Sequence, residues 1–145
     1  MKSIGIDVSK RELVVAGITS EGRLKQKVFA NTRRGAASLA TFLKAQETTA
    51  AVPCVIESTG DFHLLSSLIL TEKGFSVKCI NPLLTKKYQR SSVRNAKSDS
   101  VDAVRLAEIG IHEGTLSPFV AEKSIIRAKK LASSCAHLER VAQML

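Results

Sequence analysis

The chain has 145 residues, 44% of them hydrophobic, which is enough for one globular domain with a buried core. Lysine and arginine total 22 against 13 aspartates and glutamates, and the formal net charge of +9 favours an anionic partner such as nucleic acid. No apolar run reaches the ~20 residues of a membrane-spanning helix, and the first residues lead into a strand pattern instead of a cleavable signal, so we expect a cytoplasmic protein.

The first part of the chain is predicted to form an antiparallel meander followed by a helix. The strands are expected at residues 3–8, 11–19 and 23–30. The third of these alternates apolar with charged residues, as a strand with one solvent-exposed face does. Residues 33–46 then carry apolar side chains at helical spacing, with Asn31 or Thr32 as the N-cap.

A β-α-β unit is predicted next. Residues 52–56 are a nearly continuous apolar run that ends in Glu57, which is typical of a strand covered on both faces. A helix over 61–73 follows, stops at Gly74 and leads to another buried strand at 75–80. Because the two strands are joined through a helix, they are expected to be parallel, which makes the sheet mixed.

The remainder of the chain is predicted to be helical, apart from a basic segment. From Lys73 to Ser98 there are seven lysines and arginines and no acidic residue, so a short helix and a mobile basic loop are expected after Asn81-Pro82. Another helix runs from about Asp99 to Gly110, and residues 121–145 return to helix.

We expect residues 1–114 to form one α/β domain and residues 115–145 a helical extension. Apolar residues at a/d-like spacing, among them Leu131, Leu138 and Leu145, are typical of a coiled coil or of packing against another domain. The last helix has no cap at its end, so it is interpreted as the start of a coiled coil or a linker to a missing C-terminal domain.

The cysteines and histidines show no pattern of a metal site or of disulfides. Cys54, Cys79 and Cys135 are odd in number, widely separated and surrounded by apolar residues, which is typical of small buried residues in a reducing compartment. The three histidines also lack the close spacing of metal ligands. We therefore expect no structural metal from either residue type.

Two acidic residues belong to apolar strands. Asp7 follows Ile4-Gly5-Ile6 in the first strand, and Glu57 ends the fourth. A buried carboxylate without a partner is costly, so such residues usually have a metal ion, a cation or hydrogen-bond donors beside them. If the first and fourth strands are neighbours, as a β-α-β unit added beside the first strand would make them, both acids lie at one edge of the sheet.

Asp99 and Asp102 form a second acidic pair, three residues apart on one face of a predicted helix. Leu106 and Ile109 continue this face, so the acids are expected to face the body of the protein. Two-metal phosphoryl transfer needs several carboxylates that converge on divalent ions about 4 Å apart. Each acid also has an ordinary explanation, as a turn residue, a lysine partner or a helix cap, but their joint placement favours a metal site.

Four motifs carry a family resemblance. They are Gly5-Ile6-Asp7-Val8-Ser9-Lys10, Ile56-Glu57-Ser58-Thr59-Gly60, Asn81-Pro82 and Lys97-Ser98-Asp99-Ser100-Val101-Asp102-Ala103. Together they closely resemble the N-terminal domain of the DEDD transposases of insertion sequences, the family that includes the pilin-gene inverting recombinase. The resemblance spans roughly residues 1–110, and the combination of motifs is specific although Gly-Ile-Asp alone is weak.

The resemblance implies a RuvC-like, ribonuclease H-like α/β fold with a mixed five-stranded sheet and helices on both faces. It implies a site that binds Mg²⁺ or Mn²⁺ through four carboxylates, those of Asp7, Glu57, Asp99 and Asp102. It also implies strand cleavage and exchange on DNA, guided in characterised relatives by a structured bridge RNA, in a nucleoid-associated bacterial or archaeal protein that forms a homo-oligomer at full length. Six basic residues are expected to bind nucleic acid: Lys10, Lys86, Lys87, Arg90, Arg94 and Lys97.

One departure from the family limits this prediction. In that family a C-terminal domain supplies a serine that becomes linked to DNA, and nothing after residue 110 resembles it. We therefore expect metal and nucleic-acid binding from this chain, with little or no complete recombination on its own.

Other assignments remain open at this point. Ser9 as a serine nucleophile lacks a base, and Tyr88 as a tyrosine nucleophile lacks an Arg-His-Arg constellation. An actin-like ATPase would also begin with a hairpin and an acid after Gly-Ile, but it needs a second phosphate loop and a second lobe. A non-catalytic DNA- or RNA-binding module, in which the acids only cap and pair, is the third alternative.

Overall fold

In the computed structural model, the described residues are 1–22, 26–58, 60–91, 99–112 and 116–120, with separate positions between 127 and 143. For 89–91 and 99–101 the backbone alone is described. Some predictions fall outside this part of the chain: the basic loop, with Arg94 and Lys97, most of the helix predicted over 121–145, and the side chains of Arg90 and Asp99.

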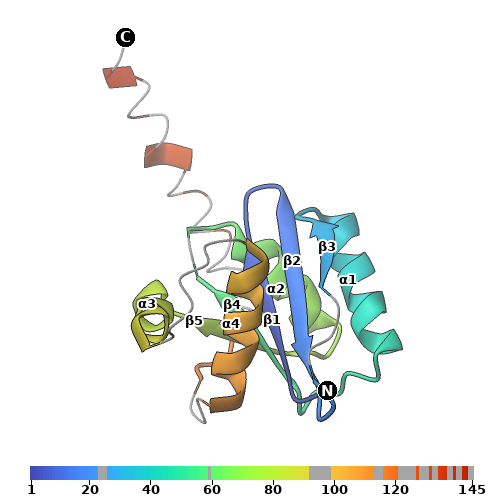
Figure 1. Ribbon diagram of the computed structural model, residues 1–145. Coiled ribbons are helices and arrows are strands. Elements are labelled where there is room, and N and C mark those ends of the chain that lie inside the picture. Colours follow the sequence, from blue (N-terminus) through green and yellow to red (C-terminus); the bar gives the residue numbers. More distant parts are fainter. Residues whose placement is uncertain are drawn as a thin grey trace.

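The centre of the fold is a mixed five-stranded sheet (Figure 1). Its strands are β1 (Ser3–Val8), β2 (Glu12–Ile18), β3 (Lys27–Ala30), β4 (Pro53–Glu57) and β5 (Ser76–Ile80), in the order β3-β2-β1-β4-β5. The β1–β2 and β2–β3 pairs are antiparallel, whereas β1–β4 and β4–β5 are parallel. The predicted mixed sheet, with the first and fourth strands adjacent, is confirmed.

Helices cover both faces of this sheet. They are α1 (Arg33–Ala45), α2 (His63–Glu72), α3 (Pro82–Ser91) and α4 (Asp99–His112). Figure 1 shows α4 on one face, across β1 and β2, and α1 and α2 on the other, with α3 beside α4. Ile4 and Ile6 of β1 are fully buried in the large cluster that α1 and α2 cover, while the intervening Gly5 faces α4. This is the period-two alternation of a strand between two helical layers.

The first helix begins where the sequence predicted. Thr32 is its N-cap, and the Thr32 Oγ1 accepts a hydrogen bond from the Gly35 amide at 3.1 Å. Asn31, the other predicted cap, has a different role that is described with the site below.

The third strand is shorter than predicted. It begins at Lys27 rather than at residue 23, and residues 23–25 lie outside the described part of the chain. Lys27 extends over the Phe29 and Phe42 rings, 5.5 Å and 4.7 Å from their centroids, and so joins this edge strand to α1 by cation–π contacts.

Two glycines let α4 lie directly on the sheet. A Cβ added at Gly5 would lie 1.9 Å from the Ala103 carbonyl oxygen, and one at Gly110 would lie 2.2 Å from the Ser3 Oγ. Gly110 was predicted to end the helix, and this is wrong, because α4 continues to His112. Gly110 is required by the close approach to the sheet and not by a helix stop.

The chain after α4 returns to the edge of the sheet. The Cys79 amide donates to the Ser117 carbonyl at 3.2 Å, and the Phe119 amide donates to the Val77 carbonyl at 3.0 Å. These bonds cover the outer edge of β5 with a short antiparallel segment that the sequence did not predict. Within the described residues, no helix has the length and apolar character needed to cross a membrane.

The cysteines are free thiols in different surroundings. Cys54 is fully buried in β4, and burial raises the pKa of its thiol to about 12, so it stays protonated at neutral pH and acts as a small apolar residue. Cys135 was also expected to be buried, and this is wrong, because it is exposed. Its described neighbours Ser134 and Ala136 are exposed as well.

Candidate active site

Asp7 and Glu57 lie at adjacent positions on neighbouring parallel strands. Ile6 of β1 pairs with Ile56 of β4, and each acid is the next residue along its strand. Neighbouring strands are about 4.8 Å apart, so the two backbones bring these carboxylates to one edge of the sheet. Both side chains are partly buried. The first and fourth strands are therefore neighbours, as predicted, and Asp7 and Glu57 lie at the same edge of the sheet.

Both acids are on the face of the sheet that α4 covers. Ile6 and Ile56 belong to the core cluster beneath α1 and α2, whereas Val55 packs with residues of α4. Since side chains alternate along a strand, Asp7 and Glu57 share the face of Gly5 and Val55.

The direction of α4 brings its first turn to the same edge. Gly5 faces Ala103 and Ala107, and Gly110 faces Ser3, so the helix runs antiparallel to β1. Two further strand residues advance about 6.6 Å, the length of roughly four helical residues. Asp7 therefore lies beside the first turn of α4. This turn contains Asp102 and the backbone of Asp99.

Asp102 has a partner that the sequence analysis did not consider. The Arg105 Nη1 lies 3.1 Å from the Asp102 Oδ1, and the exposed fractions of the two side chains are 13% and 29%. This ion pair is largely screened from water, and it directs the Asp102 carboxylate along the helix. The spacing of three residues was visible in the sequence and could have revealed this pair.

The described carboxylates do not form a complete metal site by themselves. Among the His, Cys, Asp and Glu side chains of the described residues, no three are close enough together to hold a metal ion. The fourth predicted ligand, Asp99, contributes only its backbone to the described structure. The structure thus brings Asp7, Glu57 and the start of α4 together, while a role for them in metal binding stays a prediction.

Asn31 joins the two loops that follow the strand-borne acids. Its Nδ2 donates to the Ser9 carbonyl at 2.8 Å and to the Phe62 carbonyl at 3.0 Å. Ser9 lies two residues after Asp7, and Phe62 lies between Glu57 and α2. One side-chain amide therefore holds both loops together at this edge. No local sequence pattern predicts such a contact between three distant segments.

Asn31→Ala is expected to loosen the β1–β2 turn and to lower the free energy of unfolding by about 1–2 kcal/mol, because two hydrogen bonds are lost. Limited trypsin digestion should then cleave faster at Lys10 and Arg11. Thr32→Ala is the matched control, since it removes the helix cap at a similar cost of about 1 kcal/mol and leaves the turn intact. Equal cleavage rates in the two variants would contradict this role for Asn31.

The sequence pattern of a transposase family, the DEDD transposases of the IS110 type, matches residues 4–143. The chain belongs to this family. The match continues well beyond residue 110, where the motif resemblance ended, and covers most of the helical extension. It decides against the actin-like ATPase alternative. No match was found among curated proteins.

Two solved structures of RuvC from Thermus thermophilus share the fold of this DEDD transposase. One, described as the RuvC structure, aligns with a TM-score of 0.59 at 16% identity, covering 82% of this chain and 100% of that chain. The other is RuvC in complex with a Holliday junction substrate, with a TM-score of 0.54 at 13% identity, covering 81% of this chain and 98% of that chain. The predicted RuvC-like α/β fold is confirmed by these structures, and the predicted transposase family is confirmed by the family match.

Ser9 and Tyr88 have structural roles in the transposase. The Ser9 Oγ accepts from the Glu12 amide at 3.0 Å and donates to the Glu12 carbonyl at 3.2 Å, which closes the β1–β2 turn. Tyr88 is partly buried against the apolar cluster that includes Leu106 and Ile109 of α4. These contacts give Ser9 a function in the turn and Tyr88 a function in packing, and they favour neither residue as a nucleophile.

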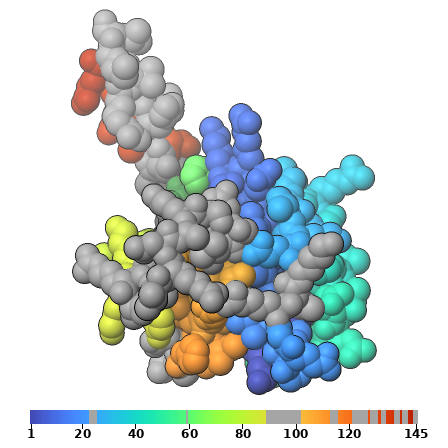
Figure 2. Space-filling view, viewed as in Figure 1, coloured from blue at the N-terminus to red at the C-terminus, as the bar shows by residue number. Residues whose placement is uncertain are grey.

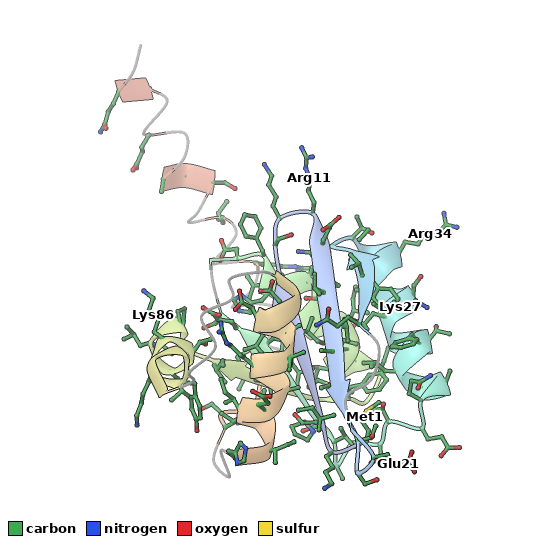
Figure 3. The ribbon with its side chains drawn as sticks, in the orientation of Figure 1. Met1, Arg11, Glu21, Lys27, Arg34 and Lys86 are labelled. Atoms are coloured by element: carbon green, nitrogen blue, oxygen red, sulfur yellow. The ribbon has the colours of Figure 1, made fainter. Side chains whose placement is uncertain are left out.

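The predicted nucleic-acid-binding residues are placed only in part. Lys10 is exposed at the tip of the β1–β2 hairpin, and Lys86 and Lys87 are exposed on α3. In Figure 3, Lys86 projects from α3 away from the sheet. The backbone of Arg90 lies on α3, whereas Arg94 and Lys97 are outside the described residues.

Proposed function

We propose that the chain is the metal-dependent nuclease domain of the transposase, which cuts and exchanges DNA strands with Mg²⁺ or Mn²⁺. The four proposed ligands are the side chains of Asp7, Glu57, Asp99 and Asp102. One observation carries the proposal: the ends of β1 and β4, each bearing an acid, lie at the level of the acidic first turn of α4.

The donor set fits these ions. It consists of carboxylate oxygens, which Mg²⁺ and Mn²⁺ prefer over nitrogen or sulfur. Bound ions would align the attacking oxygen and stabilise the leaving oxygen at the scissile phosphate. Asp7 and Glu57 contribute fixed positions on rigid strands, whereas Asp102 offers its Oδ2 while Oδ1 pairs with Arg105. Arg105 limits the repulsion between neighbouring acids and orients Asp102.

DNA is the proposed partner. The net charge of +9 favours a polyanion, and the structural neighbour bound to a Holliday junction makes branched DNA a sensible first substrate. The proposal also includes a structured guide RNA, a homo-oligomer and a location at the nucleoid in the cytoplasm, as the family resemblance implies. Complete strand exchange is proposed to need a serine nucleophile from a further domain.

The deciding experiment measures Mn²⁺ binding by isothermal titration calorimetry and cleavage of a four-way DNA junction, with and without EDTA. We expect saturable Mn²⁺ binding and DNA binding by the wild-type chain, with cleavage that EDTA abolishes. A chain that binds DNA but takes up no Mn²⁺ at millimolar concentration would be the non-catalytic binding module, and the proposed nuclease function would then be wrong.

A further inference from the structure

Four exposed cations from two distant segments meet at the tip of the β1–β2 hairpin and the start of α1. They are Lys10, Arg11, Arg33 and Arg34, and we call them the hairpin–α1 surface. We infer that this surface binds the phosphate backbone of the DNA duplex that leads into the candidate active site. The inference rests on the proposed function for its DNA partner but not for the metal ligands.

Hydrogen bonds of the backbone hold the two segments together. The Asn31 backbone N–H donates to the Arg11 carbonyl at 2.7 Å, and the Asn31 side-chain Nδ2 donates to the Ser9 carbonyl at 2.8 Å. Thr32 then caps α1, whose first residues are Arg33 and Arg34. Figure 3 shows Arg11 and Arg34 both extending away from the body of the molecule, and Figure 2 shows side chains of the hairpin and of early α1 projecting from the same end.

The position of two of these cations is unfavourable for the free protein. The N-terminus of a helix carries a partial positive charge, so acidic residues stabilise the first turn and basic residues destabilise it. The first turn of α1 contains no acid and begins with Arg33 and Arg34. An anionic partner bound here interacts favourably with both the helix dipole and the two guanidinium groups.

Acidic side chains only partly offset this charge. Glu12 is exposed at the start of β2, next to the hairpin tip, and Asp61 is exposed beside Phe62, whose carbonyl also accepts from Asn31. Both side chains are exposed to solvent. Among the described residues, neither forms an ion pair with the hairpin–α1 surface. The surface keeps a positive excess.

The location suits DNA that enters the site. The hairpin follows Asp7 directly, so the hairpin–α1 surface lies at the same edge of the sheet as the candidate carboxylates. Lys86 and Lys87 stand on α3, on the other side of α4 from α1 (Figure 1). Cations on both sides of an acidic centre can hold the two flanks of a DNA substrate while the scissile phosphate lies between them.

The test compares two pairs of substitutions that remove equal charge. Arg33→Gln/Arg34→Gln changes the hairpin–α1 surface, whereas Lys44→Gln/Lys73→Gln removes exposed lysines near the C-terminal ends of α1 and α2, at the opposite end of the sheet. Binding of the 145-residue chain to duplex DNA is measured in EDTA by fluorescence anisotropy over a range of salt concentrations.

We expect Arg33→Gln/Arg34→Gln to reduce the slope of log K against log[salt] by about 2 and to weaken binding about tenfold or more near ~0.1 M salt. The lysine pair should leave the slope nearly unchanged. Arg33→Lys/Arg34→Lys should restore the slope, because it keeps both charges. Thermal melts should show Arg33→Gln/Arg34→Gln to be at least as stable as wild type, which separates lost contacts from unfolding.

Equal effects of the two glutamine pairs would overturn the inference, because only net charge would then matter. A loss of binding to a folded RNA with no loss for duplex DNA would overturn the assignment to DNA. A wild-type chain that binds no DNA would refute the proposed partner itself, whereas an unchanged slope with intact Mn²⁺ binding refutes the hairpin–α1 surface alone.

Discussion

Gly5→Ala is expected to lower the free energy of unfolding by about 3 kcal/mol or more and the melting temperature by roughly 10 °C. The added Cβ would lie 1.9 Å from the Ala103 carbonyl oxygen and 2.5 Å from the Ala107 amide nitrogen. Both atoms belong to the backbone of α4, so no side-chain rotation relieves the clash. The helix must move off the sheet, and apolar contacts of Leu106 and Ala107 are lost with it.

Two other glycines provide the comparison for this measurement. Gly74→Ala meets no atom within 4 Å but has a φ of 88°, so it should cost only the ~1–2 kcal/mol of a left-handed residue. Gly110→Ala would clash with side-chain atoms of Ser3 and Val55, which can shift, so an intermediate loss is expected. Urea denaturation of the three variants checks this order, and a Gly5→Ala protein as stable as Gly74→Ala would contradict the close packing of α4.

Asp7→Asn is expected to abolish Mn²⁺-dependent cleavage, with a loss of at least about 100-fold, since even residues that merely support a ligand contribute 10- to 100-fold. The substitution keeps the size of the side chain and removes its charge at the edge where β1, β4 and α4 meet. The stabilisation by metal should disappear too. For wild type at 100 times Kd, this stabilisation is about 2.7 kcal/mol, or roughly 8 °C in melting temperature.

Asp61→Asn is the matched control for this experiment. Asp61 is an exposed acid near the same end of the sheet, so its replacement changes net charge equally without touching the proposed ligands. Cleavage and the metal-induced shift should remain as in wild type. If Asp7→Asn and Asp61→Asn behaved alike, the assignment of Asp7 as a metal ligand would be wrong.

The strands and helices were predictable because their signals are local. Alternation gave the two faces of β1, and the apolar run of β4 indicated burial on both sides. The failure at Gly110 has an equally clear cause. A glycine near the end of a helical pattern indicates either a stop or a close approach, and only the position of Ser3 against α4 distinguishes the two.

The candidate site was predictable in its residues but not in its contacts. Each acid alone has an ordinary explanation, and the four stood out because of their joint placement on two apolar strands and on one face of a helix. The Asn31 bridge and the hairpin–α1 surface did not stand out, since lysines, arginines and asparagines are common in polar turns. Their roles depend on which loops become neighbours after folding.

The sequence by itself determined the α/β class, the mixed sheet and the family, because these depend on periodicity and on motifs read along the chain. Tertiary structure alone decided that α4 lies antiparallel against Gly5, so that its acidic first turn reaches the level of Asp7 and Glu57. It likewise joined Arg11 to Arg33 and Arg34 in one basic surface. The physical reason is that the distance between two packed segments depends on the side-chain volumes that both contribute to the contact. The sequence of one segment alone does not show which residues of the other segment it will meet.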